Sequence, residues 1–115
     1  MNGVDFIYGT IRLIEAEHDT ALSWAREDWA CVIFNLHIDH RPEDLQRAAS
    51  HFRRLIDHAL RHRGSYFLTY HRFANPDQVL AAHPRLPEFL AAKRAMDPDE
   101  LFQSDWYRAM RALIA

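Results

Sequence analysis

The sequence predicts an α+β fold: a ferredoxin-like antiparallel or mixed sheet with helices packed on one face and a helical C-terminal tail. Three observations support this fold class. Two N-terminal stretches are rich in β-branched and aromatic residues, one long amphipathic pattern occupies the middle of the chain, and short helical patterns follow towards its end. At 115 residues, with 49% apolar and 26% charged residues, the chain has an ordinary globular composition, and we expect residues 1–115 to form a single domain.

Three stretches predict strands. Residues 5–15 and 29–38 predict the first two strands, and residues 65–72 predict the third. Between the first two strands, Asp19 or Thr20 has the side chain of a helix N-cap, so we expect a short helix there.

The clearest helical pattern spans residues 42–63. Pro42 suits the first turn, where its missing N–H is not needed, and Gly64 is expected to close the helix as a left-handed C-cap. Its apolar stripe comprises Leu45, Ala48, Ala49, Phe52, Leu55, Ile56, Ala59 and Leu60. Shorter helical segments are expected at 77–83, at 87–94 and from beyond Pro98 to residue 115.

Side chains alternate between the two faces of a strand, so each predicted strand divides into two rows. We expect the long helix to cover an apolar face that includes Ile11, Val32, Phe34 and Leu36. The opposite face would present a polar row made of Tyr8, Thr10, Arg12, Asn35, His37, Thr69 and His71. A row that mixes aromatic, arginine, amide and imidazole side chains is typical of a ligand-binding wall or an interface.

Composition excludes several classes of protein. With 14 basic and 16 acidic residues, the net charge of −2 lacks the strongly basic signature of a nucleic-acid binder. Three glycines are too few for a GxGxxG or Walker loop, so a self-contained nucleotide-binding enzyme is not expected. No apolar run approaches the roughly 20 residues that span a bilayer, and the first residues do not form a signal peptide, so we expect a cytoplasmic protein.

The histidines and the cysteine admit plainer explanations than catalysis. His37 and His71 would suit a metal, but no third ligand has a recognisable spacing, and no metal is predicted. The single cysteine, Cys31, is expected to pack as a small hydrophobe. The helix histidines are expected to form a solvated flank, and they are His51, His58 and His62.

Several short strings, in order, resemble a known family. They read YGTIRLIE at 8–15, VIFNLH at 32–37, LTYHR at 68–72, KRAMDP at 93–98 and FQSDWYR at 102–108. Together they resemble the C-terminal part of FAD-linked oxidases of the vanillyl-alcohol-oxidase-like family, which includes sugar-lactone and alditol oxidases. The resemblance covers about residues 5–108.

In that family an N-terminal domain binds FAD, and a C-terminal substrate domain lays a sheet over the isoalloxazine ring. The resemblance implies three catalytic residues here, Arg12, His37 and His71, with Arg12 holding a substrate oxyanion or the charge of the reduced flavin. It also implies that substrate or cofactor is bound by Tyr8, Thr10, Asn35, Thr69 and Tyr70. The expected function is oxidation of an alcohol or hydroxy substrate by hydride transfer to flavin.

The chain departs from the family pattern at two positions and in one larger respect. Thr10 stands where alditol and lactone oxidases carry an acid, and Arg72-Phe73-Ala74 lack the lysine that follows their third-strand histidine, which argues against aldose-type substrates. No FAD-binding half is present, so the chain resembles a fragment, a truncated reading frame or one subunit of a split enzyme, inactive without its FAD-binding partner. Two alternatives stay open: a stand-alone interaction module that forms a homodimer, and a small histidine-based metalloprotein.

Overall fold

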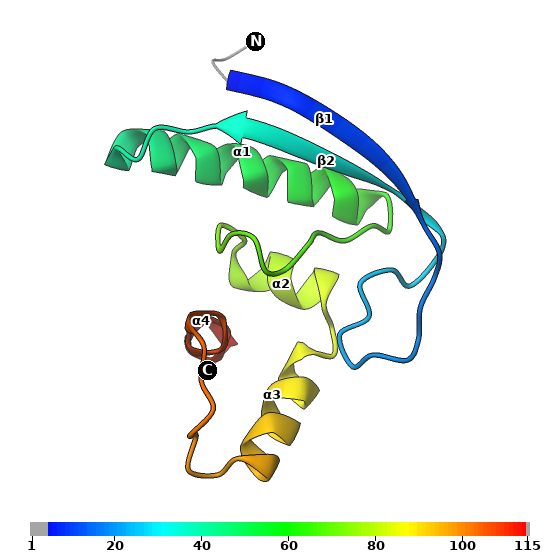
Figure 1. Cartoon of the computed structure of the whole chain (residues 1–115), viewed down its shortest axis with the longest axis vertical. Coiled ribbons are helices and arrows are strands. Elements are labelled where there is room, and N and C mark those ends of the chain that lie inside the picture. The colour runs from blue at the N-terminus through cyan, green and yellow to red at the C-terminus, as the bar shows by residue number, and fades with distance from the viewer. Residues whose placement is uncertain (1–4, 115) are drawn as a thin grey trace.

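Two long strands near the N-terminus and four helices after them make up the chain, which confirms the α+β class (Figure 1). The structure is a computed structural model that describes residues 5–114; the first four residues and the last lie outside this range. The elements are β1 (Asp5–Ile14), β2 (Trp29–His37), α1 (Pro42–Arg61), α2 (Pro76–Ala82), α3 (Leu86–Met96) and α4 (Asp105–Ile114).

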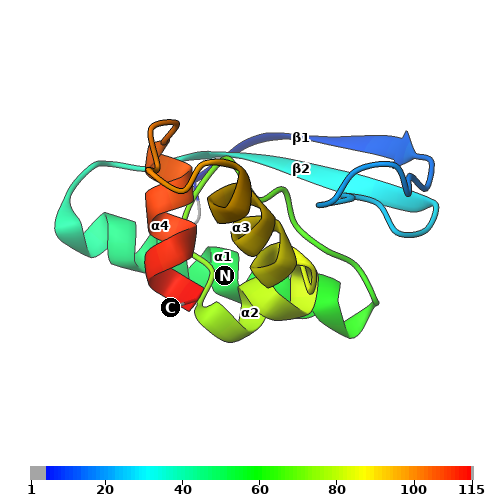
Figure 2. The ribbon, with the colours of Figure 1, turned by 90° about the horizontal axis from the view of Figure 1, so that it is seen from below.

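β1 and β2 pair antiparallel as a two-stranded ribbon. Their β-branched and aromatic residues favour this extended pairing, and the register sets Gly9 opposite Phe34 and Ile11 opposite Val32. Ile7 is an extra residue in β1, a bulge between Phe6 and Tyr8 that shifts the register near the end of the ribbon. In both views, α1 lies between this ribbon and α2 (Figures 1 and 2).

The predicted third strand does not form. Residues 65–72 are an irregular segment with a turn, and within residues 5–114 the sheet has only the two strands β1 and β2, so a ferredoxin-like sheet is not seen. The reason is that Leu68 turns inward to the helical core, whereas Tyr70, predicted to share its row, is 80% exposed. A strand would place Leu68 and Tyr70 on one face, so these opposite environments do not fit the strand alternation that the sequence suggested.

The predicted short helix after Asp19 or Thr20 is also wrong. The segment between the strands is irregular, and the carboxylate of Glu17 accepts hydrogen bonds from the backbone N–H groups of Asp19 and Thr20, both at 3.1 Å. Those two residues therefore donate to a turn and do not cap a helix. The backbone N–H of Glu17 in turn donates to the carbonyl of Ala25 at 2.9 Å, which closes the loop.

α1 ends two residues earlier than predicted, and its left-handed residue is not the glycine. Arg63 has a φ of 60° and follows the C-cap His62. The N–H of Gly64 donates to the carbonyl of Ala59 at 2.8 Å and that of Arg63 donates to Leu60 at 3.0 Å, the hydrogen-bond pattern of a Schellman motif. Gly64 serves by its small size, because a Cβ there would lie 3.0 Å from the Ala59 carbonyl oxygen.

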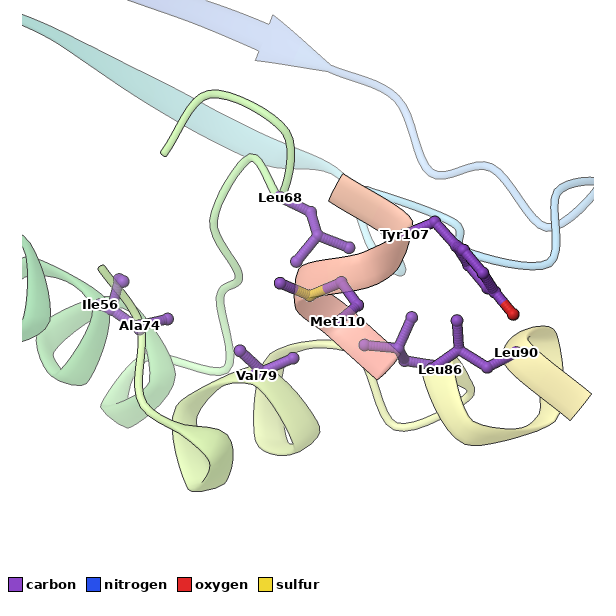
Figure 3. Close-up of a cluster of buried hydrophobic side chains, with 8 residues drawn as sticks. All are labelled: Ile56, Leu68, Ala74, Val79, Leu86, Leu90, Tyr107 and Met110. Atoms are coloured by element: carbon purple, nitrogen blue, oxygen red, sulfur yellow. The ribbon is translucent and has the colours of Figure 1, made fainter. Parts of the chain in front are cut away.

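The core lies among the helices and the segment between α1 and α2 (Figure 3). It consists of Ile56, Leu68, Ala74, Val79, Leu86, Leu90, Tyr107 and Met110. Leu22, from the loop between the strands, packs against its edge, but none of these buried residues belongs to β1 or β2. The helices therefore have a shared core to which the described part of the ribbon adds no buried side chain.

The prediction that α1 covers the apolar face of the sheet is wrong along most of the ribbon. Ile56 of the stripe is 3% exposed in the helical core, whereas Ile11 and Val32 are 71% and 48% exposed. Phe52 likewise packs on Phe73, with ring centroids 5.5 Å apart, and not on a strand. The stripe of α1 is thus largely used by the helical half of the chain.

Residues 97–104 form the connection between α3 and α4. Asp97 accepts hydrogen bonds from the backbone N–H groups of Leu101 at 2.9 Å and Phe102 at 3.0 Å, and it pairs with Lys93 at 2.5 Å. Lys93 also lies over the ring of Tyr107, 4.4 Å from its centroid. These contacts join the end of α3 to the following connection and to α4.

Candidate functional site

Four of the predicted site residues share one face of the ribbon. In the register, Tyr8 is opposite Asn35, Thr10 is opposite Ile33 and Arg12 is opposite Cys31, so all these side chains project to the same side. We call this set, Tyr8, Thr10, Arg12, Cys31, Ile33 and Asn35, the polar face of the ribbon. Tyr8 and Arg12 are exposed and the other four are half-buried.

Arg12 is the one cation on the polar face, and within residues 5–114 it forms no ion pair. Arg12 influences the pKa of Cys31, its partner across the ribbon. Burial raises the pKa of the Cys31 thiol, and the positive charge of Arg12 opposes that rise. The raised pKa keeps Cys31 a neutral thiol, which agrees with the predicted packing role. The Arg12 side chain itself is exposed to solvent.

His37 ends β2, two residues beyond Asn35, and therefore lies on the same side of that strand. Its side chain is exposed, and in the register it pairs with Asp5. The ribbon thus brings together five of the eight predicted site residues: Tyr8, Thr10, Arg12, Asn35 and His37.

The other three predicted site residues, Thr69, Tyr70 and His71, do not join the polar face, because segment 65–72 is not a strand. Thr69 and Tyr70 are exposed, and the ring of Tyr70 meets Phe67 edge-on at 4.5 Å. The prediction that Thr69 and His71 extend the polar row of the sheet is wrong, and their action on a substrate stays a prediction.

His71 instead packs among aromatic rings next to α1. Its ring centroid lies 4.0 Å from that of Phe52 and 5.0 Å from that of Phe73. Its Nδ1 atom is buried with no hydrogen-bond partner, and burial lowers the pKa of His71. A neutral imidazole in an aromatic stack is the form that this environment favours.

A second buried histidine, His83, was not suggested by the sequence. Its Nε2 lies 3.2 Å from the carbonyl oxygen of Tyr66, and its ring meets the Tyr66 ring at 5.3 Å. Burial lowers the pKa of His83 and raises the pKa of Tyr66 to about 12. His83 follows an ordinary helical segment, and only the packing of Tyr66 against it shows that it is buried.

A groove of about 500 Å³ lies between the ribbon and α1. One wall is apolar and comes from Phe6, Phe34 and Leu36, which project from the face of the ribbon opposite Arg12. The α1 wall comprises His51, Arg54, Leu55, Asp57, His58 and Arg61. The sequence had suggested only that the histidines of this helix are solvated, because the groove depends on how ribbon and helix meet.

No three side chains of His, Cys, Asp or Glu within residues 5–114 come together in a group that could hold a metal ion. No helix in the same range is long and apolar enough to cross a membrane.

The chain matches no protein-family model, and no curated protein or solved structure shows significant similarity to it. Its function is therefore inferred from the polar face of the ribbon and from the resemblance of its short strings.

Proposed function

We propose that this chain is the substrate-domain part of a cytoplasmic FAD-dependent oxidoreductase, which oxidises an alcohol or hydroxy compound by hydride transfer to flavin. The observation that carries the proposal is the polar face of the ribbon, where Arg12, which forms no ion pair within residues 5–114, shares one side of the strands with Tyr8, Thr10 and Asn35. A cation on a face with hydrogen-bonding groups suits the negative charge that a flavin ring gains when it accepts a hydride, and the charge that a substrate oxygen carries once its O–H proton has left.

The stability of the ribbon is a second argument for an FAD-binding partner. A two-stranded ribbon is marginally stable alone, and within residues 5–114 the outer edge of each strand pairs with no further strand, while Tyr8 on the polar face is 56% exposed. We assign these strands to a larger, ferredoxin-like sheet, completed when an FAD-binding domain or subunit packs against the ribbon. Such packing would cover surface that is costly to leave in water.

The residues of this chain suit one side of a flavin site and not the whole site. Three glycines provide no phosphate-binding loop, so the partner must hold the pyrophosphate of FAD. FAD, when bound there, would supply the hydride acceptor. The polar face would then bind the substrate against the flavin ring.

Within this arrangement each group has a distinct task. His37 lies six residues along β2 from Cys31, the partner of Arg12, which is about 20 Å in an extended strand. We therefore assign Arg12 to the negative charge of the reduced flavin and His37 to the hydroxyl proton of the substrate. Tyr8 and Asn35 orient the substrate by hydrogen bonds. His71 packs on α1 instead, so the proposal depends on Arg12 and His37.

The test is to express the tagged chain in its native cell and to examine what copurifies with it. We expect a flavoprotein, identified by its absorbance band near ~450 nm, whose flavin is reduced when an alcohol is added. Arg12→Ala should slow that reduction about 100-fold or more without releasing the flavoprotein, since it removes charge stabilisation and not the interface.

A matched control is Arg94→Ala, which removes an exposed arginine of α3 outside the polar face. It should leave flavin reduction unchanged. Alcohol oxidation by the purified chain alone, or recovery without any flavoprotein, would contradict the proposal.

A second candidate is a stand-alone interaction module that forms a homodimer. The specific observation in its favour is the exposed apolar side of the ribbon, where Leu13 is 88% exposed. A two-fold dimer would bury the same side chains of both copies. Light scattering at micromolar concentration distinguishes the two, because this candidate requires a doubled mass for the purified chain.

A further inference from the structure

The groove between the ribbon and α1 combines an apolar wall with a basic one. Phe6 and Phe34 meet edge-to-face, with ring centroids 6.2 Å apart, and with Leu36 they form the apolar wall. Leu55 extends this apolar surface onto α1. Both phenylalanines are exposed, so a ligand that covers them gains from the hydrophobic effect.

The basic wall follows from helical spacing. Arg54, His58 and Arg61 stand at i, i+4 and i+7 and therefore share one side of α1. Within residues 5–114 neither arginine forms an ion pair. Two unpaired guanidinium groups beside an apolar surface favour an anion.

The one acidic residue of the groove is already engaged elsewhere. Asp57 Oδ1 accepts a hydrogen bond of 2.6 Å from Gln78 Nε2, which belongs to α2. This contact directs the carboxylate towards the helical half of the chain. With two arginines against one carboxylate, the net character of the groove remains cationic.

We propose that this groove binds a small amphipathic anion, a molecule with an aliphatic or aromatic body and a carboxylate head. The body would lie on Phe6, Phe34 and Leu36, and the carboxylate would pair with Arg54 and Arg61. A volume of about 500 Å³ falls in the range of small-molecule sites, roughly 300–1,000 Å³. Two turns of an α-helix, about 10–12 Å wide, would occupy more than about 800 Å³, so a small molecule fits better than a partner helix.

This site is separate from the proposed flavin-facing surface. Phe34 pairs with Gly9 in the ribbon, and Arg12 pairs with Cys31, so alternation places the groove and Arg12 on opposite faces. Ligand binding in the groove can therefore be tested on the isolated chain, whatever becomes of the oxidoreductase proposal.

The experiment compares decanoate with 1-decanol, which has the same alkyl chain without the charge. We expect decanoate, titrated below its micelle concentration, to shift the amide NMR signals of Phe34, Leu36 and Leu55. Calorimetry should show that decanoate binds about tenfold more tightly than decanol, because only its head group pairs with the arginines.

The decisive variant is the double substitution Arg54→Gln and Arg61→Gln, with Arg94→Gln on α3 as its matched control. All three side chains are exposed, so we expect the fold to persist, as the amide NMR spectrum will show. The double variant should lose about tenfold in affinity for decanoate and nothing for decanol, and the control should bind both ligands as the native chain does.

Three results would overturn the proposal. Equal affinity for decanoate and decanol would show an apolar surface with no anion site. Shifts produced by an acidic amphipathic peptide but not by decanoate would assign the groove to a protein partner. A doubled mass in light scattering, together with no response of these amides to decanoate, would show that a second copy covers the groove.

Discussion

The helical half of the chain and the ribbon place similar apolar side chains in opposite environments. In the helical half, Leu86 is 0% exposed and Val79 is 1% exposed. In the ribbon, Leu13 is 88% exposed although its strand is well paired. Regular backbone hydrogen bonding and side-chain burial are thus separate properties. Both parts have regular backbone hydrogen bonds, but the buried cluster of apolar side chains lies in the helical half.

The difference teaches where each part obtains its stability. Helices α1 to α4 gain from a shared apolar cluster, whereas the ribbon depends on backbone hydrogen bonds and on contacts made by its connecting loop. Trp24 of that loop packs on Phe67 at 5.3 Å, and Glu27 pairs with Arg63. We infer that the helical half does not depend for its folding on burial of the ribbon side chains.

The largest expected effect tests this contrast directly. Leu86→Ala should lower the free energy of unfolding by about 2–5 kcal/mol, because it leaves a cavity in the core. Leu13→Ala, its matched control, should change stability by less than about 0.5 kcal/mol, because its side chain already meets water. Urea unfolding followed by circular dichroism measures both, and comparable losses would refute the contrast.

A pH dependence of smaller size should arise from two histidines of the helical half, His71 and His83. Burial lowers the pKa of His71 and of His83 in the folded chain, so the unfolded chain binds their protons more readily. The free energy of unfolding should therefore fall as pH drops from the ordinary histidine pKa of 6.5 through the lowered folded values.

Urea unfolding at several pH values between about 7.5 and 5 measures this dependence. His83→Gln should flatten it, since that side chain no longer titrates. His51→Gln on α1 is the control for a histidine outside the buried cluster. If His83→Gln leaves the slope unchanged, then His83 is not the group whose protonation destabilises the fold.

The sequence predicted the parts of this molecule that local patterns determine. Both strands and α1 were recovered to within two residues, because strand composition and the spacing of the α1 stripe act over neighbouring positions. Alternation alone was also enough to bring Arg12 and Asn35 to one face. These features need no knowledge of distant contacts.

The parts that failed depend on contacts between distant residues. The sequence of segment 65–72 alternates like a strand. However, Leu68 packs in the helical core, and this tertiary packing takes precedence over the local strand pattern. The environment predicted for His71 was wrong because it depended on the predicted strand. The His71 ring packs instead on Phe52, which is distant in sequence. The groove likewise arises only where Leu55 of α1 faces Phe34 of the ribbon.

A capping box formed by Asn75 and Gln78 stabilises the start of α2, and its loss should have an intermediate effect on the free energy of unfolding. Asn75 caps this helix by accepting a hydrogen bond of 2.9 Å from the backbone N–H of Gln78, and the Gln78 side chain accepts from the N–H of Asn75 at 3.1 Å. Asn75→Ala should therefore cost about 1 kcal/mol, measured by urea unfolding. Asn75→Asp is the control, because aspartate caps equally well, and an equal loss in both variants would contradict the capping role.

The smallest expected effect concerns the junction where the ribbon loop meets the helical half. Arg63 holds the left-handed conformation that favours glycine, and it also pairs with Glu27 of the loop. In a Glu27→Gln background, which removes the ion pair, Arg63→Gly should raise the free energy of unfolding by about 0.5–1 kcal/mol.

Gly64→Ala should lower the free energy of unfolding, because the added Cβ would lie 3.0 Å from the Ala59 carbonyl oxygen. That carbonyl already accepts hydrogen bonds from His62 and Gly64 at 3.0 and 2.8 Å, so it cannot move without weakening both. Thermal unfolding of the three variants measures the signs. A loss of stability in Arg63→Gly would contradict the left-handed conformation of Arg63, and a gain in Gly64→Ala would contradict the close approach of residue 64 to the Ala59 carbonyl.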